Sequence, residues 1–600
     1  MRHGLLSPIS MALLSQIMIL PATAVAMAKQ MMPTSTNIDL TLTPLFDGDQ
    51  GSASAINVNQ VIWGRAFRQG QDVFALPINT VNIDMGYVSD AGVLFSDAEG
   101  ELQATERIGT SGPSTARVWK AGRPTVGNVS IVYTALPRLI SRGTKNGPAL
   151  DFRLDQGGLV GSGMAFLGAP PYEPEAPVHT TLQWDLSRSP EGTLAAWSMG
   201  DGEGPFEIAT ESLLGIASGV QEAYFAVGPL NRLTSPDDYM YTDEADVFNM
   251  YWFGTPTFDP LPLGVRLKKL FREMSIFFQD KGNSYRIFLR HNPFRGSLTG
   301  TALRRSFMYG YDDSEWDCPP TLQDREAVLA HEMVHNWVLL TQDGVADNWY
   351  HEGLAEYYQV LLRFRFGNLS AREYLEQVNE KLVAYYTSPL VTWPLERVQK
   401  VTWNMTDAQR VPYLRGFTFA LHVNDLLRSA GHSIDDLVRT LADKMQVGES
   451  VGVEDYLKLL SQLLGDDKSR ADTLVMEMKE GKLLTPGAHS LEQLPFQARL
   501  VRHELEKFEL GFDESSLLQG PHIVKGLIQG SRAQLAGLQN GDRIQLECGS
   551  THLTVRAEIS ATLKLKVFRD GSAPFVVEFW PRSQDKVEAY QYEVVENEEL

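Results

Sequence analysis

The chain has 600 residues, which is too long for one hydrophobic core, so two to four domains are expected. Its composition is that of a globular protein, with 43% hydrophobic and 21% charged residues. The 53 basic and 74 acidic residues give a formal charge of −21. This charge argues against nucleic acid as a partner, because phosphate binding requires a basic surface.

The first 28 residues have the pattern of a cleavable signal peptide. A short basic start precedes an apolar run at 11–20, and small residues follow, with Ala26-Met27-Ala28 as a candidate cleavage site. The apolar run is shorter than the ~20 residues that span a bilayer, so a retained membrane anchor is the less favoured alternative. We therefore predict a secreted or periplasmic protein with no membrane span in the mature chain.

Residues 29–230 are predicted to form a β-sandwich-like domain. Apolar residues alternate with polar ones in "NIDLTLTPLF" (37–46) and in "GNVSIVYTAL" (127–136), as they do in half-buried strands. Glycine and proline interrupt the chain at short intervals, for example in "GAPPYEPEAP" (168–177). A stack of short antiparallel strands is the expected result.

Residues 231–490 are predicted to form a second domain, mainly helical from about 260 to 480. The segment 263–280 has apolar residues at helical spacing. Ser370 is a predicted N-cap, and Ser433 stands in capping-box relation to Asp436. The domain also contains the most informative motif of the chain, "AVLAHEMVHNWVLL" (328–341).

On a helix that starts after Thr321, the two histidines of this motif lie one turn apart on one face. His331 and His335 can then bind a single zinc ion at about 2.0–2.1 Å. Glu332 follows the first histidine directly, so its carboxylate can lie near the open position of the ion without binding it. That is the place of a general base for a zinc-activated water.

A third ligand is expected from a second helix. A histidine six residues after His335 is excluded, because that position is Thr341. The segment "NWYHEGLAEYY" (348–358) instead offers Glu352 and Glu356, one turn apart on the same face. One of them can bind the metal while the other accepts a proton from the far nitrogen of a ligand histidine. His351 is a rival ligand, but its position turns it about 100° away from Glu352.

Strands are predicted again after about residue 508. "TLKLKVFRDGSAPFVVEFW" (562–580) has the pattern of two strands joined at Asp570-Gly571. The chain has two cysteines, Cys318 and Cys548, and the sequence does not imply a disulfide between them.

The two histidine-containing segments resemble a known family. "HEMVHNW" followed by "WYHEGLAEYY" is similar to the gluzincin metallopeptidases, whose third ligand is the glutamate of a W-x-x-E-G signature. The resemblance implies a thermolysin-like catalytic domain with Glu352 as ligand and Glu356 behind a ligand histidine. "VPYLRGFTFAL" (411–421) resembles the Y-x-K-G helix of the glycyl aminopeptidase family. It implies that Tyr413 stabilises the oxyanion of the reacting carbonyl.

The chain departs from that family where the free amine of a substrate would bind. Members carry a glycine-rich stretch with a glutamate, and the matching segment "GSLTGTALRRS" (296–306) has none. Gly300 and Ala302 take the substrate-contacting positions, with Ala302 in place of the glutamate, and Arg415 replaces the usual lysine. Zinc-dependent hydrolysis is therefore expected, and aminopeptidase specificity is in doubt.

The C-terminal residues 500–590 resemble a PDZ domain, which completes the architecture of that family. The matching points lie in "HIVKGLIQGSRAQLAGLQNGDRIQLE" (522–547). "ELGFD" (509–513) resembles the loop whose backbone amides hold a C-terminal carboxylate, which implies a peptide ligand at Leu510, Gly511 and Phe512. The alternative is that this domain only packs on the catalytic one.

The combined prediction is a multidomain α+β protein that acts as a secreted metallopeptidase with one zinc ion per chain and peptide or protein substrates. The alternative is a degenerate peptidase fold that presents peptides as a scaffold through its PDZ-like domain. Metal content separates the two, because only the enzyme requires the ion.

Overall fold

The computed structural model describes residues 36–595 except 48–50, 142–143, 145–146, 172–177, 210–218, 234–247, 281–283, 295–298, 314–318, 341–346, 466–467, 493, 519 and 548–553. The predicted signal peptide and both cysteines lie outside the described residues. The chain divides into two compact units. The first unit contains the described residues up to Lys268 and those from 282 to 316, and the second contains 269–281 and those from 317 onward.

Three sheets of the first unit contribute to one hydrophobic core. Leu42 and Val58 come from the first sheet, Phe74 from the second and Trp197 from the third, and all are buried. The first sheet contains, in strand order, β15 (Phe206–Ala209), β12 (Val178–Trp184), β1 (Thr36–Asp47), β2 (Ser52–Trp63), β9 (Val129–Ala135), β5 (Leu94–Asp97) and β6 (Gly100–Glu101). The second contains β4 (Ile83–Asp84), β3 (Asp72–Thr80), β8 (Ser114–Ala121) and β7 (Ala104–Ser111). The third contains β10 (Arg153–Asp155), β11 (Gly158–Ser162), β16 (Tyr224–Gly228), β13 (Leu194–Trp197) and β14 (Gly200–Asp201).

The predicted alternation is confirmed in β9 and in β1 up to Pro44, where every second residue is buried. The N-terminal region is therefore rich in β-sheet, as predicted, although three sheets rather than two share the core.

A further sheet of the first unit replaces part of the expected helical region. It contains β17 (Leu230–Arg232), β18 (Phe248–Phe253), β19 (Tyr285–Asn292), β21 (Ser306–Asp312) and β20 (Thr299–Leu303). The prediction of a mainly helical chain from about 260 missed β19, β20 and β21. In β19 the residues from Tyr285 to Arg290 are all buried, so the strand lacks the alternation that marks a half-exposed strand.

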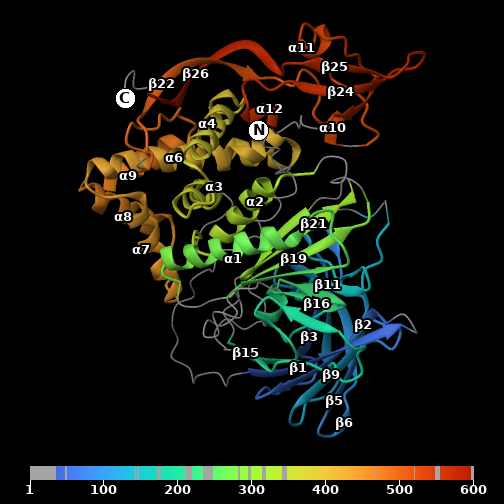
Figure 1. The fold of residues 1–600 in the computed structure, drawn as a ribbon. Coiled ribbons are helices and arrows are strands. Elements are labelled where there is room, and N and C mark those ends of the chain that lie inside the picture. Colours follow the sequence, from blue (N-terminus) through green and yellow to red (C-terminus); the bar gives the residue numbers. More distant parts are fainter. Residues whose placement is uncertain are drawn as a thin grey trace. The chain divides into compact units, whose positions relative to one another are not determined.

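The second unit holds most of the helices (Figure 1). They are α2 (Leu322–Val334), α3 (Asn348–Arg365), α4 (Ala371–Thr387), α5 (Leu395–Gln399), α6 (Thr406–Ser429), α7 (Ile434–Gln446), α8 (Val453–Leu464) and α9 (Lys468–Lys479), while α1 (Pro260–Phe277) is shared between the units. The predicted N-cap Ser370 is confirmed, and it forms a capping box with Glu373 at the start of α4. The predicted capping box of Ser433 and Asp436 is confirmed at the start of α7.

A β-region completes the second unit. The long strands β22 (Ala498–Phe508) and β26 (Arg582–Val594) pair with each other, and β23 (Arg543–Leu546), β24 (Leu563–Phe568) and β25 (Phe575–Phe579) form a three-stranded sheet. The short helices α10 (Ser515–Leu518), α11 (Arg532–Leu535) and α12 (Thr554–Ala557) accompany them. The hairpin predicted around Asp570-Gly571 is confirmed as β24 and β25.

In the described part of the chain, no helix combines the length and apolar character needed to cross a bilayer.

Candidate metal centre

Helix α2 places the two histidines of the motif. Thr321 is its N-cap: its hydroxyl accepts from the amide of Asp324, and the Asp324 carboxylate accepts from the amide of Thr321. This capping box fixes where the helix begins. His335 is the C-cap residue and still has helical backbone angles, so it remains one turn beyond His331.

Helix α3 brings the third side chain. A buried ion pair between Arg363 of α3 and Glu326 of α2, with Nε–Oε1 at 3.3 Å, joins the two helices away from the histidines. Glu352 lies in the second turn of α3, almost completely buried.

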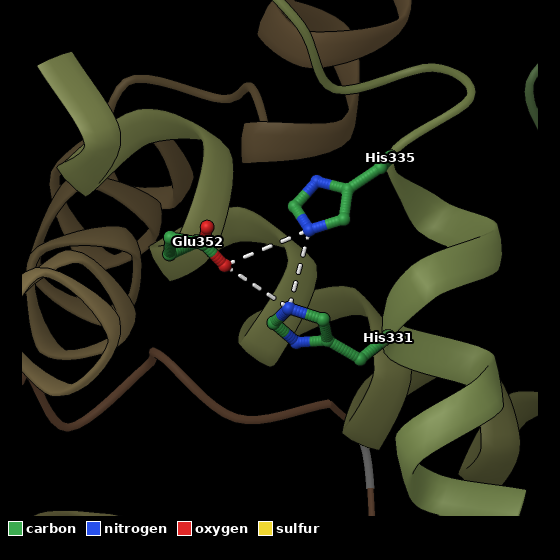
Figure 2. A group of neighbouring side chains, drawn as sticks. All are labelled: His331, His335 and Glu352. Carbon is green, nitrogen blue, oxygen red and sulfur yellow. Dashed lines mark hydrogen bonds and ion pairs between the residues drawn. The ribbon is translucent and has the colours of Figure 1, made fainter. Parts of the chain in front are cut away.

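Three side chains converge on one point (Figure 2). His331 Nε2 lies 3.1 Å from Glu352 Oε2 and 3.2 Å from His335 Nε2, and His335 Nε2 lies 3.6 Å from Glu352 Oε2. The three possible ligand atoms are all within 4.8 Å of one another. They are the three ligands that the resemblance to gluzincins implies.

The arrangement fits a metal ion. The two ring nitrogens face each other and also face the same carboxylate oxygen. If both imidazoles are neutral, at least one of these three contacts joins two donors or two acceptors, so the three contacts cannot all be hydrogen bonds. Glu352 Oε1 is also buried, with no hydrogen-bond partner among the described residues. A cation between the three atoms would satisfy all of them, and two imidazoles with one carboxylate are the ligand set of a catalytic zinc ion with an open fourth position.

The charges at the cluster agree with this reading. Burial alone would lower the pKa of His331, but Glu352 and Glu356 raise it to about 10. Burial would raise the pKa of Glu352, but hydrogen bonds with both histidines lower it to about 2. The cluster therefore holds a positive charge beside an ionised carboxylate, and a metal ion would take the place of the proton.

Glu332 is buried beside the cluster, with 4% of its surface exposed. Burial raises its pKa to about 7, although the positive charges of His335 and His331 act in the opposite direction. A carboxylate with a pKa near neutrality can both accept and return a proton, as a general base must.

Helix α6 places Tyr413 over the cluster. Its ring is stacked on that of His331, with centroids 5.7 Å apart. Burial and the charges of Glu352 and Glu332 raise the pKa of Tyr413 well above its usual value, so the hydroxyl keeps its proton and remains a donor. This is the state that a hydrogen-bond donor to an oxyanion requires.

Two glycines allow α3 and α6 to approach this closely. A Cβ atom on Gly353 would lie 2.3 Å from Gly416 Cα, and one on Gly416 would lie 2.1 Å from the carbonyl oxygen of Trp349. Any side chain at either position would push the helices apart and move Tyr413 away from Glu352. We did not single out these glycines from the sequence, although glycine inside a helix is a signal of close packing.

The two other candidate ligands of α3 lie elsewhere. His351 accepts a hydrogen bond at Nε2 from the amide of Leu340 at 3.1 Å, and burial lowers its pKa to about 4. Its imidazole is therefore neutral and already engaged, and it is not part of the cluster. Glu356 lies behind His331, with Oε1 3.0 Å from Nδ1, although the two groups are not aligned as an ideal hydrogen bond.

Arg415 does not have the surroundings of a substrate-contacting residue, which corrects our expectation. It is fully buried, and its guanidinium donates to the carbonyl oxygens of Val391 at 2.8 Å, Trp393 at 2.7 Å and Met478 at 3.3 Å. The planar guanidinium directs its donors to carbonyls at three separate positions, so the arginine here ties α6 to neighbouring chain segments.

Gly300 and Ala302 lie on β20, where they pair with Tyr309 and Phe307 of β21. This strand belongs to the first unit, whereas the cluster belongs to the second. Asp313, on the same unit, pairs with His291 at 3.0 Å. The substrate-contacting role of Gly300 and Ala302 stays a prediction.

The segment 509–513 is part of a small core of the C-terminal β-region. Leu510 and Phe512 are buried in it, so any ligand contact from them would come from their backbone. Gly511 has a φ of +87°, and a Cβ atom there would lie 2.8 Å from Cβ of Ala533. Glycine is therefore required at this turn. Peptide binding at 510–512 stays a prediction.

The comparisons with known proteins place the fold. No protein-family model matches the sequence, and no curated protein does so either. The chain is similar to the structure of an aminopeptidase N family protein from Idiomarina loihiensis, with a TM-score of 0.58 and 15% identity over 93% of this chain and 98% of that one.

Two further similarities have lower TM-scores. One is to an M1 zinc metallopeptidase mutant from Deinococcus radiodurans bound to a Tyr-Ser-Ala substrate, with a TM-score of 0.44 and 18% identity over 76% of this chain and 95% of that one. The other is to leukotriene A4 hydrolase from Saccharomyces cerevisiae, with a TM-score of 0.43 and 14% identity over 76% of this chain and 70% of that one.

The chain thus has a multidomain α+β fold similar to that of the aminopeptidase N family protein, with a His331, His335 and Glu352 cluster in its helical region. The predicted multidomain α+β fold is confirmed at this level. The narrower resemblances, to the glycyl aminopeptidase family and to a PDZ domain, stay predictions.

Proposed function

We propose that this protein is a secreted or periplasmic zinc-dependent metallopeptidase. The observation that carries the proposal is the convergence of His331, His335 and Glu352 next to the buried carboxylate of Glu332. The fold, which is similar to that of an aminopeptidase N family protein, supports it. A structural zinc site is less consistent with the geometry, because such sites use four protein ligands and the described residues offer three.

A zinc ion bound by these three ligands would lower the pKa of a water molecule and polarise the carbonyl group of a substrate. Glu332 accepts a proton from the attacking water and returns it to the leaving amine. Tyr413 donates a hydrogen bond to the carbonyl oxygen as negative charge develops on it. Glu356 holds the far side of the His331 ring.

The proposal is tested by incubating a mixed peptide library with the purified protein, once loaded with zinc and once treated with a chelator. We expect cleavage products that disappear on chelation and return when zinc is restored. If the zinc-loaded protein cleaves no peptide, the enzyme proposal is wrong, and the alternative of a non-catalytic peptidase fold is favoured.

The Tyr413→Phe variant is expected to lower kcat about 100-fold or more, with little change in KM. The reason is that the lost hydroxyl contacts the substrate only as charge develops on its carbonyl oxygen. Steady-state kinetics on one peptide checks this. Tyr386→Phe is a matched control, since it removes a buried hydroxyl that donates to the carbonyl oxygen of Leu484 in the same unit. An equal loss of kcat in the control would contradict the role of Tyr413.

The free amine of a substrate is expected to contribute little to recognition. The segment 296–306 has two arginines and no carboxylate, so it offers no partner for an ammonium group. We expect similar kcat/KM values for a short peptide and for its N-acetylated form. A preference for the free peptide above about tenfold, roughly 1.4 kcal/mol, would contradict this and point to Asp312 or Asp313 as the acid that binds the amine.

A further inference from the structure

Helix α4 lies between the C-terminal β-region and the metal cluster in the second unit. On one face, Asn379 pairs with the backbone of Tyr592 in β26: its Nδ2 donates to the carbonyl oxygen and its Oδ1 accepts from the amide, both at 2.8 Å. A side-chain amide that satisfies both backbone groups of one residue fixes the helix against the strand. The capping box at Ser370 fixes the start of the same helix.

Lys381 follows Asn379 by two residues, so it leaves the helix about 200° around, on the opposite face. Its Nζ contacts Oε2 of Glu356 on α3. Both side chains are largely buried, with 16% and 17% of their surface exposed. Lys381 also lies over the ring of Phe417, 5.8 Å from its centroid. The lysine is therefore held by an ion pair and by a ring contact.

The carboxylate of Glu356 is shared between two groups. Oε2 faces Lys381, and Oε1 lies 3.0 Å from Nδ1 of His331. Without the lysine, the carboxylate could rotate toward Gln359, whose Nε2 already donates to Oε2 at 3.5 Å. Rotation would withdraw Oε1 from the histidine. Nδ1 must keep its proton if Nε2 is to offer a lone pair to a metal ion, and a carboxylate at Nδ1 ensures this.

We propose that Lys381 is a positioning residue for the metal ligand His331, and that it acts through Glu356. The inference rests on the proposed zinc function of the cluster. It assigns α4 a role in that function: the face that carries Asn379 is anchored to β26, and the opposite face supports the carboxylate behind the ligand.

The test measures zinc affinity of the full-length protein by competition with a chelator, beside kcat and KM. We expect Lys381→Met to lower zinc affinity about tenfold, within the range known for residues that support a metal ligand. Lys381→Arg, which keeps a cation able to bond a carboxylate, should restore most of it. Lys479→Met is the matched control, because it removes a half-buried lysine paired with Asp347 on the same unit and should leave zinc affinity unchanged.

A double-mutant cycle separates action through Glu356 from a general effect. If Lys381 acts through Glu356, adding Lys381→Met to Glu356→Gln should cause no further loss of zinc affinity. Additive losses, or an unchanged affinity in Lys381→Met, would overturn the inference. If Lys381→Met fails to fold, Lys381→Gln takes its place in the same cycle, because it also removes the charge that faces Glu356. Failure of the proposed function is distinguishable, because the unmodified protein would then bind no zinc or, when loaded with zinc, cleave no peptide.

Discussion

The Glu352→Gln variant should lose most of its zinc, with affinity falling about 100-fold or more. The amide keeps the shape of the side chain but removes the negative charge, and Glu352 is the carboxylate that lies 3.1 Å and 3.6 Å from the two ligand nitrogens. Loss of a ligand should cost at least as much as loss of a supporting residue, which typically costs 10–100-fold, about 1.4–2.7 kcal/mol. Elemental analysis after dialysis, together with chelator competition, measures the effect.

His335→Ala should behave in the same way, because it removes one of the two ring nitrogens. Glu396→Gln is the control: this carboxylate is largely exposed and pairs with Lys400, so its loss should not affect zinc binding. The sharper comparison is between the zinc affinities of the Glu352→Gln and Glu356→Gln variants. If Glu356→Gln lost the ion and Glu352→Gln kept it, the assignment of ligand and supporting residue would be reversed.

Much of this site follows from local sequence rules. The capping box at Thr321 and the four-residue spacing of the histidines place both imidazoles on one side of α2 without any tertiary information. The same holds for the capped starts of α4 and α7. Such signals are short-range, so the residues that carry them are adjacent in the sequence.

The choice between Glu352 and Glu356 could not be made from spacing, since both lie on one face of α3. Only the resemblance to gluzincins indicated Glu352, and only the packing of α2 against α3 shows which oxygen faces both histidines. His351 lies outside the cluster and accepts a hydrogen bond from the backbone amide of Leu340. No pattern of side chains in the sequence predicts that bond.

Contacts between distant segments account for what sequence reasoning missed. Lys381 meets Glu356 across 25 positions of the chain, and on a helix rich in charged residues it looks like an ordinary exposed lysine. Arg415 was predicted to contact the substrate because of its place in the motif around Tyr413. In the structure its guanidinium donates to carbonyl groups at three other positions of the chain. In β19, Arg290 is buried in an ion pair with Asp151. Because a charged residue then occupies a buried position, the hydrophobic pattern of the sequence does not reveal this central strand.

The Glu332→Gln variant should keep its zinc and lose about 10²–10⁴-fold in kcat, the contribution typical of a positioned acid–base group. Gln has nearly the same shape, so the ligands on both sides of α2 stay in place, but an amide cannot accept the proton of the attacking water. Burial holds the pKa of the native carboxyl at about 7, the range in which a group can both take and return a proton. KM should change little, because Glu332 is assigned to proton transfer and not to substrate binding.

Zinc content and kcat must be measured on the same preparation, because the prediction is that kcat falls while zinc content stays the same. Glu326→Gln is the matched control: it removes another buried carboxylate of α2, one paired with Arg363 away from the cluster. It should lower thermal stability and leave kcat nearly unchanged below its unfolding temperature. A Glu332→Gln protein that lost its metal would show that this carboxylate supports the ion. One that kept full kcat would show that proton transfer uses another group, and the mechanism proposed for this fold would fail at its central step.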